Sequence, residues 1–525
     1  MSIHLRSVAH VFKLHTDLST CSGHALTNRV SSTILEIEIE SIKVSTKITI
    51  LGAGPGGYIG AIRAAQLGAR VTVIEDDRLG GTCLNWGCIP TKTIKATAEA
   101  LEAARRFSEF GLVLDGTVKP DMKAVMARKD KIVDTLVLGI QKTFDHYHIE
   151  LIEGMGSVLE PGLVRVEKKD GDTVDVTGDK LILAPGSKPR KVKDFHFDRQ
   201  RILTSDQALT LDEIPDELVI IGGGVVGSEF GFIFNELGSR VMIVEAMDRV
   251  VGLPSVDPDS SKILQREMKK RKIKLFLNKV VTRTENQGGG KTRLILGPSP
   301  FLKKIGPKDK KEIEITADKV LVTIGRDSKN RGIGLKRLGL ELDSEGWIMT
   351  NEKMETNIPD VYAIGDALGP EKIMLAHAAS AEAMIAVENA LGGHRVMNYD
   401  CVPIGIFTLP EIAGVGITEA QAEERGYEYR SDIFQMRGLG KSQAIGQIAG
   451  QTKIISDVKT GKIYGVHIIG SHASDLIGEA TLALKLGATT EELASTIHVH
   501  PTLSEAMAET AYAALDIPFH IKAGL

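Results

Sequence analysis

Two cysteines, Cys83 and Cys88, lie in the run Gly-Thr-Cys-Leu-Asn-Trp-Gly-Cys-Ile-Pro-Thr-Lys that spans residues 81–92. A thiol pair beside a flavin or a nicotinamide can pass two electrons between a disulfide and a hydride carrier. The alternatives are a structural zinc half-site and two buried thiols. Zinc normally requires a second ligand pair, and the four cysteines of the chain include no second closely spaced pair. The run therefore favours redox chemistry, and we expect no metal site.

A second group of residues, His498-Val-His500-Pro501-Thr-Leu-Ser-Glu505, lies near the C-terminus. Proline prevents a helix from continuing backward, so a helix is expected to begin within Thr502–Glu505, with His500 just before it. A carboxylate that holds a histidine fixes its tautomer and raises its basicity for proton transfer. In isolation, a histidine near a helix start is more often structural. A redox dithiol that needs a proton acceptor favours a catalytic His500 oriented by Glu505.

Two segments, 48–75 and 218–245, repeat one pattern that could position this chemistry. Each reads as an apolar strand, a Gly-x-Gly-x-x-Gly turn, a helix, and a second strand that ends in a glutamate 23 residues after the first glycine. Such a turn brings a pyrophosphate to backbone N–H groups and to a helix N-terminus, and the acidic residue accepts hydrogen bonds from ribose hydroxyls. The residues concerned are Gly52, Gly54, Gly57 and Glu75 in the first segment, and Gly222, Gly224, Gly227 and Glu245 in the second.

The sequence therefore predicts two dinucleotide sites. Because the Glu245 carboxylate would repel a 2′-phosphate, we expect NAD rather than NADP at the second site.

The bulk properties of the 525-residue chain limit the remaining possibilities. This length predicts three or four domains. A net charge of −4 argues against nucleic acid or an anionic membrane as a partner, and no apolar run is long enough to span a bilayer. Few cysteines in so long a chain indicate a reducing compartment. From about residue 400 the pattern changes to strands and two helices without a dinucleotide signature.

Taken together, these features resemble the dihydrolipoamide dehydrogenase branch of the flavin-dependent pyridine nucleotide-disulfide oxidoreductases. The resemblance runs from about Lys47 to the C-terminus and rests on four motifs: the cysteine run, both glycine turns, Thr356–Asp366, and His498–Glu505. It implies an α/β fold with two Rossmann-like dinucleotide-binding domains, for FAD and NAD, and a C-terminal α+β dimerisation domain. The implied boundaries are 1–45 (an extension), 46–190 and 327–398 (FAD), 191–326 (NAD) and 399–525 (interface).

The resemblance also implies a role for each matching residue. Cys83 would be the interchange thiol that attacks the substrate, and Cys88 the charge-transfer thiol that faces the flavin. Lys92 would lie near flavin N5 with Glu229 as its carboxylate partner, and His500 would serve the cysteines of the other subunit. The remaining implied contacts are to FAD (Gly52, Gly54, Gly57, Glu75, Gly156, Ala184, Gly186, Asp366, Met374, Leu375, Ala376 and His377) and on the NAD side (Gly222, Gly224, Gly227, Glu245, Val281 and Gly325).

The activity implied is oxidation of protein-bound dihydrolipoamide by NAD, in a homodimer that serves a 2-oxo acid dehydrogenase complex or the glycine cleavage system. Departures from the family pattern occur at Pro185, Leu409 and residues 327–330, away from the electron path. The alternatives are another NAD(P)H-dependent disulfide reductase of this fold and a non-catalytic flavoprotein subunit. We expect a cytoplasmic location, or the mitochondrial matrix or a plastid if residues 1–45 are a transit peptide rather than a dispensable extension.

Overall fold

The structure is a computed structural model that describes residues 46–192, 195, 197–287, 289–302, 306 and 311–520. The expected N-terminal extension, residues 1–45, lies outside this range. Within the described residues, no helix is both long enough and apolar enough to cross a membrane.

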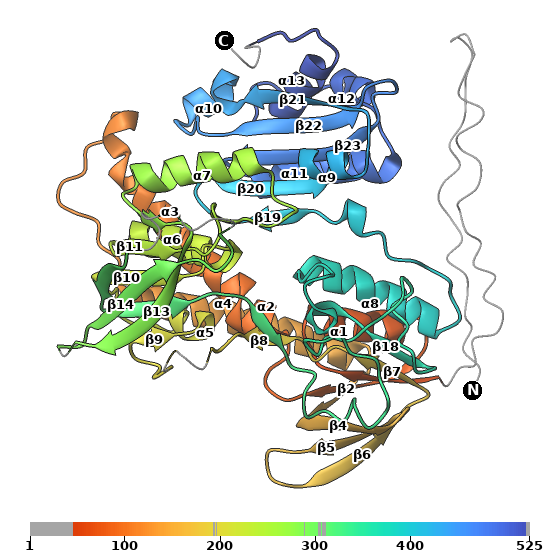
Figure 1. Cartoon of the computed structure of the whole chain (residues 1–525). Helices are drawn as coiled ribbons and strands as arrows, with labels where there is room; N and C mark the ends of the chain where they lie inside the picture. The colour runs from red at the N-terminus through yellow and green to blue at the C-terminus, as the bar shows by residue number, and fades with distance from the viewer. Residues whose placement is uncertain are drawn as a thin grey trace, which may run out of the picture. The chain divides into compact units, whose positions relative to one another are not determined.

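The first glycine turn follows the central strand of a five-stranded parallel sheet (Figure 1). The helix after the turn, α1 (Pro55–Gln66), packs along α8 (Ala376–Ala390), which returns from a distant part of the sequence. The strands in spatial order are β18 (Val361–Ala363), β7 (Lys180–Leu183), β1 (Lys47–Leu51), β2 (Arg70–Glu75) and β3 (Glu150–Glu153).

The second glycine turn lies in a sheet of the same architecture. Lys47 pairs with Arg70 at the start of the first sheet, and Glu217 pairs with Arg240 at the equivalent place in the second. The sequence repeat is therefore a structural repeat. The strands in spatial order are β12 (Lys274–Phe276), β11 (Arg240–Val244), β10 (Glu217–Ile221), β16 (Lys319–Val322) and β9 (Ile202–Leu203), and the helices are α5 (Ser205–Ala208), α6 (Val225–Leu237) and α7 (Pro258–Lys270).

Each parallel sheet also carries a three-stranded antiparallel sheet, inserted at the same point of the repeat. The first comprises β4 (Met155–Glu160), β5 (Leu163–Glu167) and β6 (Thr173–Thr177), and the second β13 (Lys279–Asn286), β14 (Thr292–Pro298) and β15 (Ile313–Ala317). The short strands β8 (Ser187–Pro189) and β17 (Arg326–Ser328) pair with each other where the chain passes between the two halves. β13 and β14 pair antiparallel as a hairpin.

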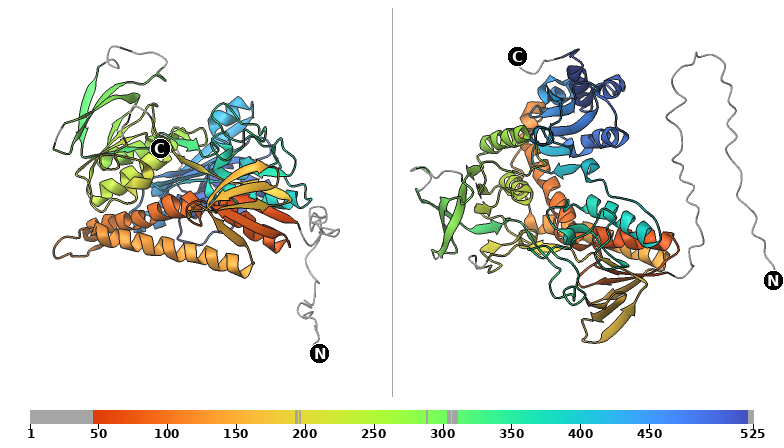
Figure 2. Two further views of the ribbon diagram at one scale, coloured as in Figure 1. Left: turned by 90° about the horizontal axis from the view of Figure 1, so that it is seen from below. Right: turned by 45° about the vertical axis from the view of Figure 1, so that its right-hand side comes forward.

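The cysteine run leads into two long helices, which Figure 2 shows side by side in orange. They are α3 (Cys88–Arg105) and α4 (Met122–His146), preceded by α2 (Gly81–Trp86) and separated by η1 (Phe107–Phe110). Helix α3 also packs against α6 of the second half. The cysteines therefore lie between the two glycine turns.

The C-terminal part is an antiparallel five-stranded sheet with helices on it. Its strands in spatial order are β19 (Ile404–Ile406), β20 (Glu411–Gly416), β23 (Ile463–Gly470), β22 (Gln451–Asp457) and β21 (Tyr429–Gln435). Its helices are α9 (Glu419–Glu424), α10 (Gly440–Ala444), α11 (Ala473–Leu486), α12 (Thr490–Ser495) and α13 (Glu505–Ala514), and its 3-10 turns are η3 (Tyr399–Cys401) and η4 (Met436–Gly438). A further 3-10 turn, η2 (Gly365–Leu368), lies between β18 and α8 in the first half. The expectation of two helices was wrong, because α9, α10 and α12 are too short to show a period.

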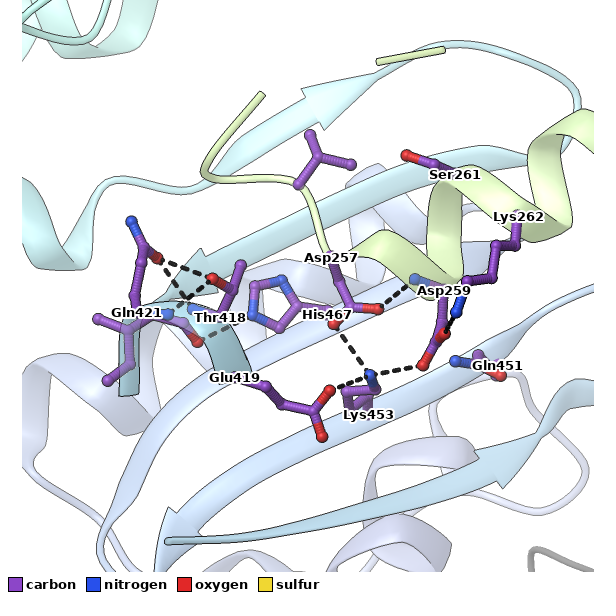
Figure 3. Close-up of polar contacts among 12 residues, drawn as sticks. Asp257, Asp259, Ser261, Lys262, Thr418, Glu419, Gln421, Gln451, Lys453 and His467 are labelled. Carbon is purple, nitrogen blue, oxygen red and sulfur yellow. Dashed lines mark hydrogen bonds and ion pairs between the residues drawn. The ribbon is translucent and has the colours of Figure 1, made fainter. Parts of the chain in front are cut away.

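A buried ion cluster joins the second half of the repeat to this C-terminal sheet (Figure 3). Lys453 on β22 is 1% exposed, and its ammonium lies 2.8–2.9 Å from carboxylate oxygens of Asp257, Asp259 and Glu419. Asp257 and Asp259 belong to the start of α7, and Glu419 begins α9. The buried His467 ring beside them bonds the Ile417 carbonyl through Nε2. One lysine thus holds two helix starts against the sheet.

The expected fold class is confirmed: two dinucleotide-type α/β halves are followed by a C-terminal α+β part.

Candidate functional site

The cysteine run is helical on both sides of Gly87 rather than an open loop. Cys83 lies in α2 and Cys88 is the first residue of α3. A Cβ at Gly87 would lie 2.9 Å from the Thr82 carbonyl oxygen, so only glycine allows the two helices to meet this closely. The break brings the two thiols into contact and places Cys88 at a helix N-terminus, where the dipole favours a thiolate.

The two thiols have different acidities. Both cysteines are free thiols, so the structure describes the reduced pair. The pKa of Cys88 is lowered to about 7, because the hydrogen bond from Cys83 and the nearby Lys92 ammonium together outweigh burial and the Glu229 carboxylate, which raise it. The same hydrogen bond raises the pKa of Cys83, because ionising Cys83 would place a second charge beside the first. Cys88 therefore holds the thiolate, and Cys83 keeps the proton.

Lys92 faces Cys88 from one turn further along α3, since residues i and i+4 share a helix face. Its ammonium lies 2.8 and 3.0 Å from the two carboxylate oxygens of Glu229, a buried residue of α6. It also lies 4.2 Å from the centre of the Phe407 ring, and the Phe407 N–H donates to Glu229 Oε1 at 2.9 Å. The expected partners Lys92 and Glu229 are thus in contact. Phe407, from the C-terminal part of the chain, contacts both of them.

The first glycine turn has the close packing that a phosphate-binding turn requires. Gly52 has φ +104°, and a Cβ there would meet the Ala184 carbonyl oxygen at 2.1 Å. A Cβ at Gly57 would meet the Gly52 carbonyl oxygen at 1.8 Å. By contrast, a Cβ at Gly54 would have only Gly81, the first residue of α2, near it, at 3.9 Å. Two glycines are therefore required for packing, while Gly54 leaves the backbone accessible and lies beside the start of the cysteine helix.

Glu75 ends β2 and reaches back to this turn. Its carboxylate accepts the N–H of Ala53 at 2.6 Å and that of Asp77 at 2.9 Å. Burial raises the pKa of Glu75 to about 7, although the two N–H groups favour the charged form. The carboxylate is therefore fixed in position, with oxygen lone pairs still available for a ribose hydroxyl.

Asp366 lies in a polar network that the sequence did not predict. Its Oδ2 accepts the Ser187 hydroxyl at 2.5 Å, and that hydroxyl accepts Nε–H of Arg326 at 2.5 Å. Ser187 belongs to β8 and Arg326 to β17, so the network lies at the connection between the two halves. Their positions directly after Gly186 and Gly325 were the signal that could have identified them.

The remaining residues expected at FAD lie at the start of α8 and on β4. Met374 and Leu375 precede α8, and Ala376 and His377 are its first residues. His377 bonds the Pro403 carbonyl through Nε2 at 2.7 Å. A Cβ at Gly156 would meet Leu51 Cδ1 at 2.3 Å, so Gly156 lies in the core behind the glycine turn.

The second glycine turn repeats the first. A Cβ at Gly222 would meet the Thr323 carbonyl oxygen at 2.5 Å and one at Gly227 the Gly222 oxygen at 1.9 Å, while Gly224 faces open space. Glu245 accepts the N–H groups of Gly223 at 2.5 Å and Met247 at 2.7 Å.

The two other residues expected on the NAD side differ in position. Gly325, with φ +113°, follows β16, and a Cβ there would have no neighbour within 4 Å. Val281 lies on β13 and packs against the apolar core of this half.

His500 and Glu505 are paired as expected. His500 Nδ1 lies 2.8 Å from Glu505 Oε1, and the Thr502 N–H donates to Glu505 Oε2 at 2.8 Å. Burial would raise the pKa of Glu505, but the Thr502 N–H and His500 hold it below its usual value. The His500 side chain is 78% exposed, so Nε2 faces outward. Helix α13 begins at Glu505 and packs on α12, β21 and β22, so this pair lies apart from Cys83 and Cys88 of the same chain.

The donors present fit two dinucleotides. Two glycine turns each open at the second glycine and each carry a fixed carboxylate, and a thiolate and an ammonium lie between them on α3. Sequence reasoning missed Ser187, Arg326 and Phe407. It also missed Glu382, which is fully buried on α8 and accepts the Gly365 N–H at 2.6 Å and the Tyr399 hydroxyl at 2.7 Å.

Comparisons with known proteins agree with this arrangement. Residues 46–383 match the family described as pyridine nucleotide-disulphide oxidoreductase, and residues 402–511 match its dimerisation domain. A mitochondrial dihydrolipoyl dehydrogenase of Arabidopsis thaliana is 38% identical over 90% of this chain and 91% of its own length. A leghemoglobin reductase of Glycine max is 38% identical over 91% and 89%. The crystal structure of LpdA from Mycobacterium tuberculosis has a TM-score of 0.80 at 29% identity, over 89% of this chain and 99% of LpdA.

Proposed function

The chain belongs to the pyridine nucleotide-disulphide oxidoreductases, and on that premise we propose that it is an enzyme that oxidises dihydrolipoamide to lipoamide and reduces NAD. The observation that carries the proposal is the Cys83–Cys88 pair, with its proton on Cys83 and its thiolate on Cys88 beside Lys92. Residues 46–190 and 327–398 would carry FAD, residues 191–326 NAD, and residues 399–525 the contact with a second copy.

The thiol chemistry assigns each side chain a task. A thiol of dihydrolipoamide gives its proton to His500 of the partner subunit, and the resulting thiolate attacks Cys83 of the oxidised pair. Cys83 forms a mixed disulfide with the substrate as the Cys83–Cys88 bond breaks, and Cys88 is left as a thiolate beside the Lys92 ammonium. The second substrate thiol displaces Cys83, so that lipoamide leaves and the reduced pair remains.

Two dinucleotides complete the reaction. FAD, held by Gly52, Gly54, Gly57, Glu75 and Asp366, would supply the transfer of an electron pair from the thiol pair to NAD as a hydride. NAD would lie on Gly222, Gly224, Gly227 and Glu245. Lys92, paired with Glu229, would stabilise negative charge beside the thiolate.

Exposed apolar residues close to His500 support a homodimer. Leu482 and Leu486 on α11 and Ile497 and Val499 beside the histidine are 58–97% exposed. Exposed apolar residues of this kind are typical of a protein–protein contact. The second copy would cover them and would bring each His500 to the other subunit's cysteines.

The lipoyl group would be carried by another protein, in a 2-oxo acid dehydrogenase complex or the glycine cleavage system. We place the enzyme in the cytoplasm, or in the mitochondrial matrix or a plastid if residues 1–45 direct it there. The soybean relative suggests a haem protein as an alternative electron acceptor, but the paired His500 and Glu505 favour a thiol substrate that must lose a proton.

The test is anaerobic reduction of the purified holoenzyme by dihydrolipoamide, followed by addition of NAD. We expect a long-wavelength absorbance band and then NADH. A matched pair of variants assigns the thiolate: Cys83→Ser, which leaves the Cys88 thiolate beside an oxidised flavin, should show the band without added reductant, and Cys88→Ser should not. A flavin that dihydrolipoamide leaves oxidised but NADH reduces would reject the substrate and leave the family membership intact.

A further inference from the structure

The ring of Phe407 is held over the Lys92 ammonium by more than one constraint. Phe407 lies in the turn between β19 and β20, and its N–H donates to Glu229. Directly after it, the Thr408 hydroxyl donates to the Pro410 carbonyl at 2.6 Å and closes the turn. The position of the half-buried ring is therefore fixed by the bond of the Phe407 N–H and by the bond that Thr408 makes within the turn.

A second lysine of α3 anchors the same turn from the other end. Lys95 is 5% exposed, and its ammonium contacts Glu99 at 2.6 Å and Glu411, the first residue of β20, at 2.9 Å. Its own charge is thus neutralised by two carboxylates, while its Nζ lies 5.8 Å from the Phe407 ring centre. The Lys95–Glu411 ion pair fixes the turn on α3. The Phe407 ring centre is therefore held closer to the Lys92 ammonium than to that of Lys95.

Lys92 is bounded on two sides as a result. The Glu229 carboxylate binds the ammonium, and the aromatic face covers it at 4.2 Å, which is within the range of a cation–π contact. An aliphatic side chain of similar size would fill the space without attracting the charge.

We propose that Phe407 is a positioning residue of the redox site: its ring holds the Lys92 ammonium against Glu229 so that the charge stays directed at Cys88. The C-terminal part would then act on the thiolate of its own subunit, in addition to contributing His500 to the partner. The proposal rests on the proposed function only in that Cys88 is the redox thiolate.

The consequence is a change in the acidity of Cys88. Without the ring, water reaches the ammonium and weakens its field at the sulfur, so the pKa of Cys88 rises above its value of about 7. We expect a rise of about half a pKa unit, which is about a threefold fall in the ratio of thiolate to thiol at a given pH.

The experiment is a pH titration of the long-wavelength band of the holoenzyme after reduction with one equivalent of dithionite. This reductant makes the readout independent of lipoamide, so the positioning role can fail while the substrate assignment stands, and the reverse. We expect Phe407→Leu to raise the apparent pKa by about half a unit or more, and Phe407→Tyr, which keeps the ring, to leave it near the wild-type value.

Phe434→Leu is the matched control, because Phe434 is buried in the C-terminal core, away from Lys92. It should reduce stability without moving the titration. Should Phe407→Leu not accumulate as folded protein, Phe407→Met takes its place. The proposal is overturned if the Leu and Met variants titrate like wild type, if Phe407→Tyr shifts as far as they do, or if Phe434→Leu produces the same shift.

Discussion

Glu75 and Glu245 hold the same two backbone positions in the two halves of the repeat. Each carboxylate accepts the N–H of the residue after the first glycine and the N–H two residues beyond itself, through Ala53 and Asp77 in one half and Gly223 and Met247 in the other. Such a carboxylate is fixed before any ligand arrives, which lowers the cost of ordering it on binding.

Substitution of each glutamate should therefore affect the binding of one dinucleotide and not of the other. Glu245→Gln removes a charged acceptor from the ribose and the repulsion of a 2′-phosphate, and it leaves the thiol site intact. We expect KM for NAD to rise about tenfold with little change in kcat, and the preference over NADP to fall.

Steady-state kinetics with both nucleotides provide the measurement. Glu75→Gln is the matched control and should reduce flavin retention on gel filtration without changing the nucleotide preference. An unaltered NAD to NADP ratio in Glu245→Gln would remove Glu245 from the ribose.

If His500 serves the cysteines of the other subunit, a hybrid dimer of two inactive variants should be active. His500→Gln and Cys83→Ser homodimers should each be nearly inactive. In a hybrid dimer, one site combines intact cysteines with an intact histidine, and the other carries both defects. Mixed at equal concentration after dissociation, the two variants should recover about a quarter of wild-type activity, because half of the dimers are hybrids with one good site.

The measurement is dihydrolipoamide-dependent NADH formation by the mixture and by tagged hybrids purified through both tags, which should have about half of wild-type activity because one of their two sites is intact. Hybrids as inactive as their parents would mean that His500 serves its own subunit.

Much of the fold was predictable because its signals are local. The glycine turns and the glutamates 23 residues later lie within single sequence segments, and the structure repeats them with matching strand register. The pairing of His500 with Glu505 is local for the same reason.

What was missed depends on contacts between distant segments. Ser187 contacts Asp366, and Phe407 contacts Lys92, although more than 170 residues separate each pair in the sequence. No hydrophobic period or motif spacing could therefore predict these contacts. The short helices α9, α10 and α12 were missed because one turn and a half gives no hydrophobic period.

Glu382 predicts a dependence of stability on pH. Burial raises its pKa to about 7, against the Gly365 N–H and the Tyr399 hydroxyl that favour the charged form. The folded state thus keeps a proton that the unfolded state releases near pH 4.5, so this group reduces stability as pH rises from about 4.5 to 7. Glu382→Gln should flatten that decline, by of order 3 kcal/mol at most.

Chemical denaturation of the holoenzyme between about pH 5 and 8 measures the slope. Glu388→Gln, on the same helix, is the opposite control, because Arg395 and Arg63 outweigh burial and lower the pKa of Glu388. Glu388→Gln should lower the free energy of unfolding at neutral pH and leave unchanged its fall between about pH 4.5 and 7. An unchanged slope in Glu382→Gln would show that Glu382 does not titrate in this range.

The Lys453 cluster predicts a large loss of stability from one buried side chain. Lys453→Met fills similar space but leaves the carboxylates of Asp257, Asp259 and Glu419 without their common cation (Figure 3). An uncompensated buried charge costs about 3–5 kcal/mol. Burial would raise the pKa of Asp259 and of Glu419, and Lys453 holds both below their usual values. In the variant both groups regain protons more readily, so the loss should be greatest at neutral and alkaline pH and smaller near pH 5.

Lys459→Met is the matched control, since Lys459 pairs with Glu428 at the surface with both side chains about 70% exposed. Exposed pairs contribute little, and this change should stay within about 0.5 kcal/mol. Denaturant midpoints of both variants at two pH values make the comparison. If Lys453→Met stays within about 1 kcal/mol of wild type at neutral pH, the carboxylates reach water or protons without the lysine, and the cluster is not what holds α7 to the C-terminal sheet.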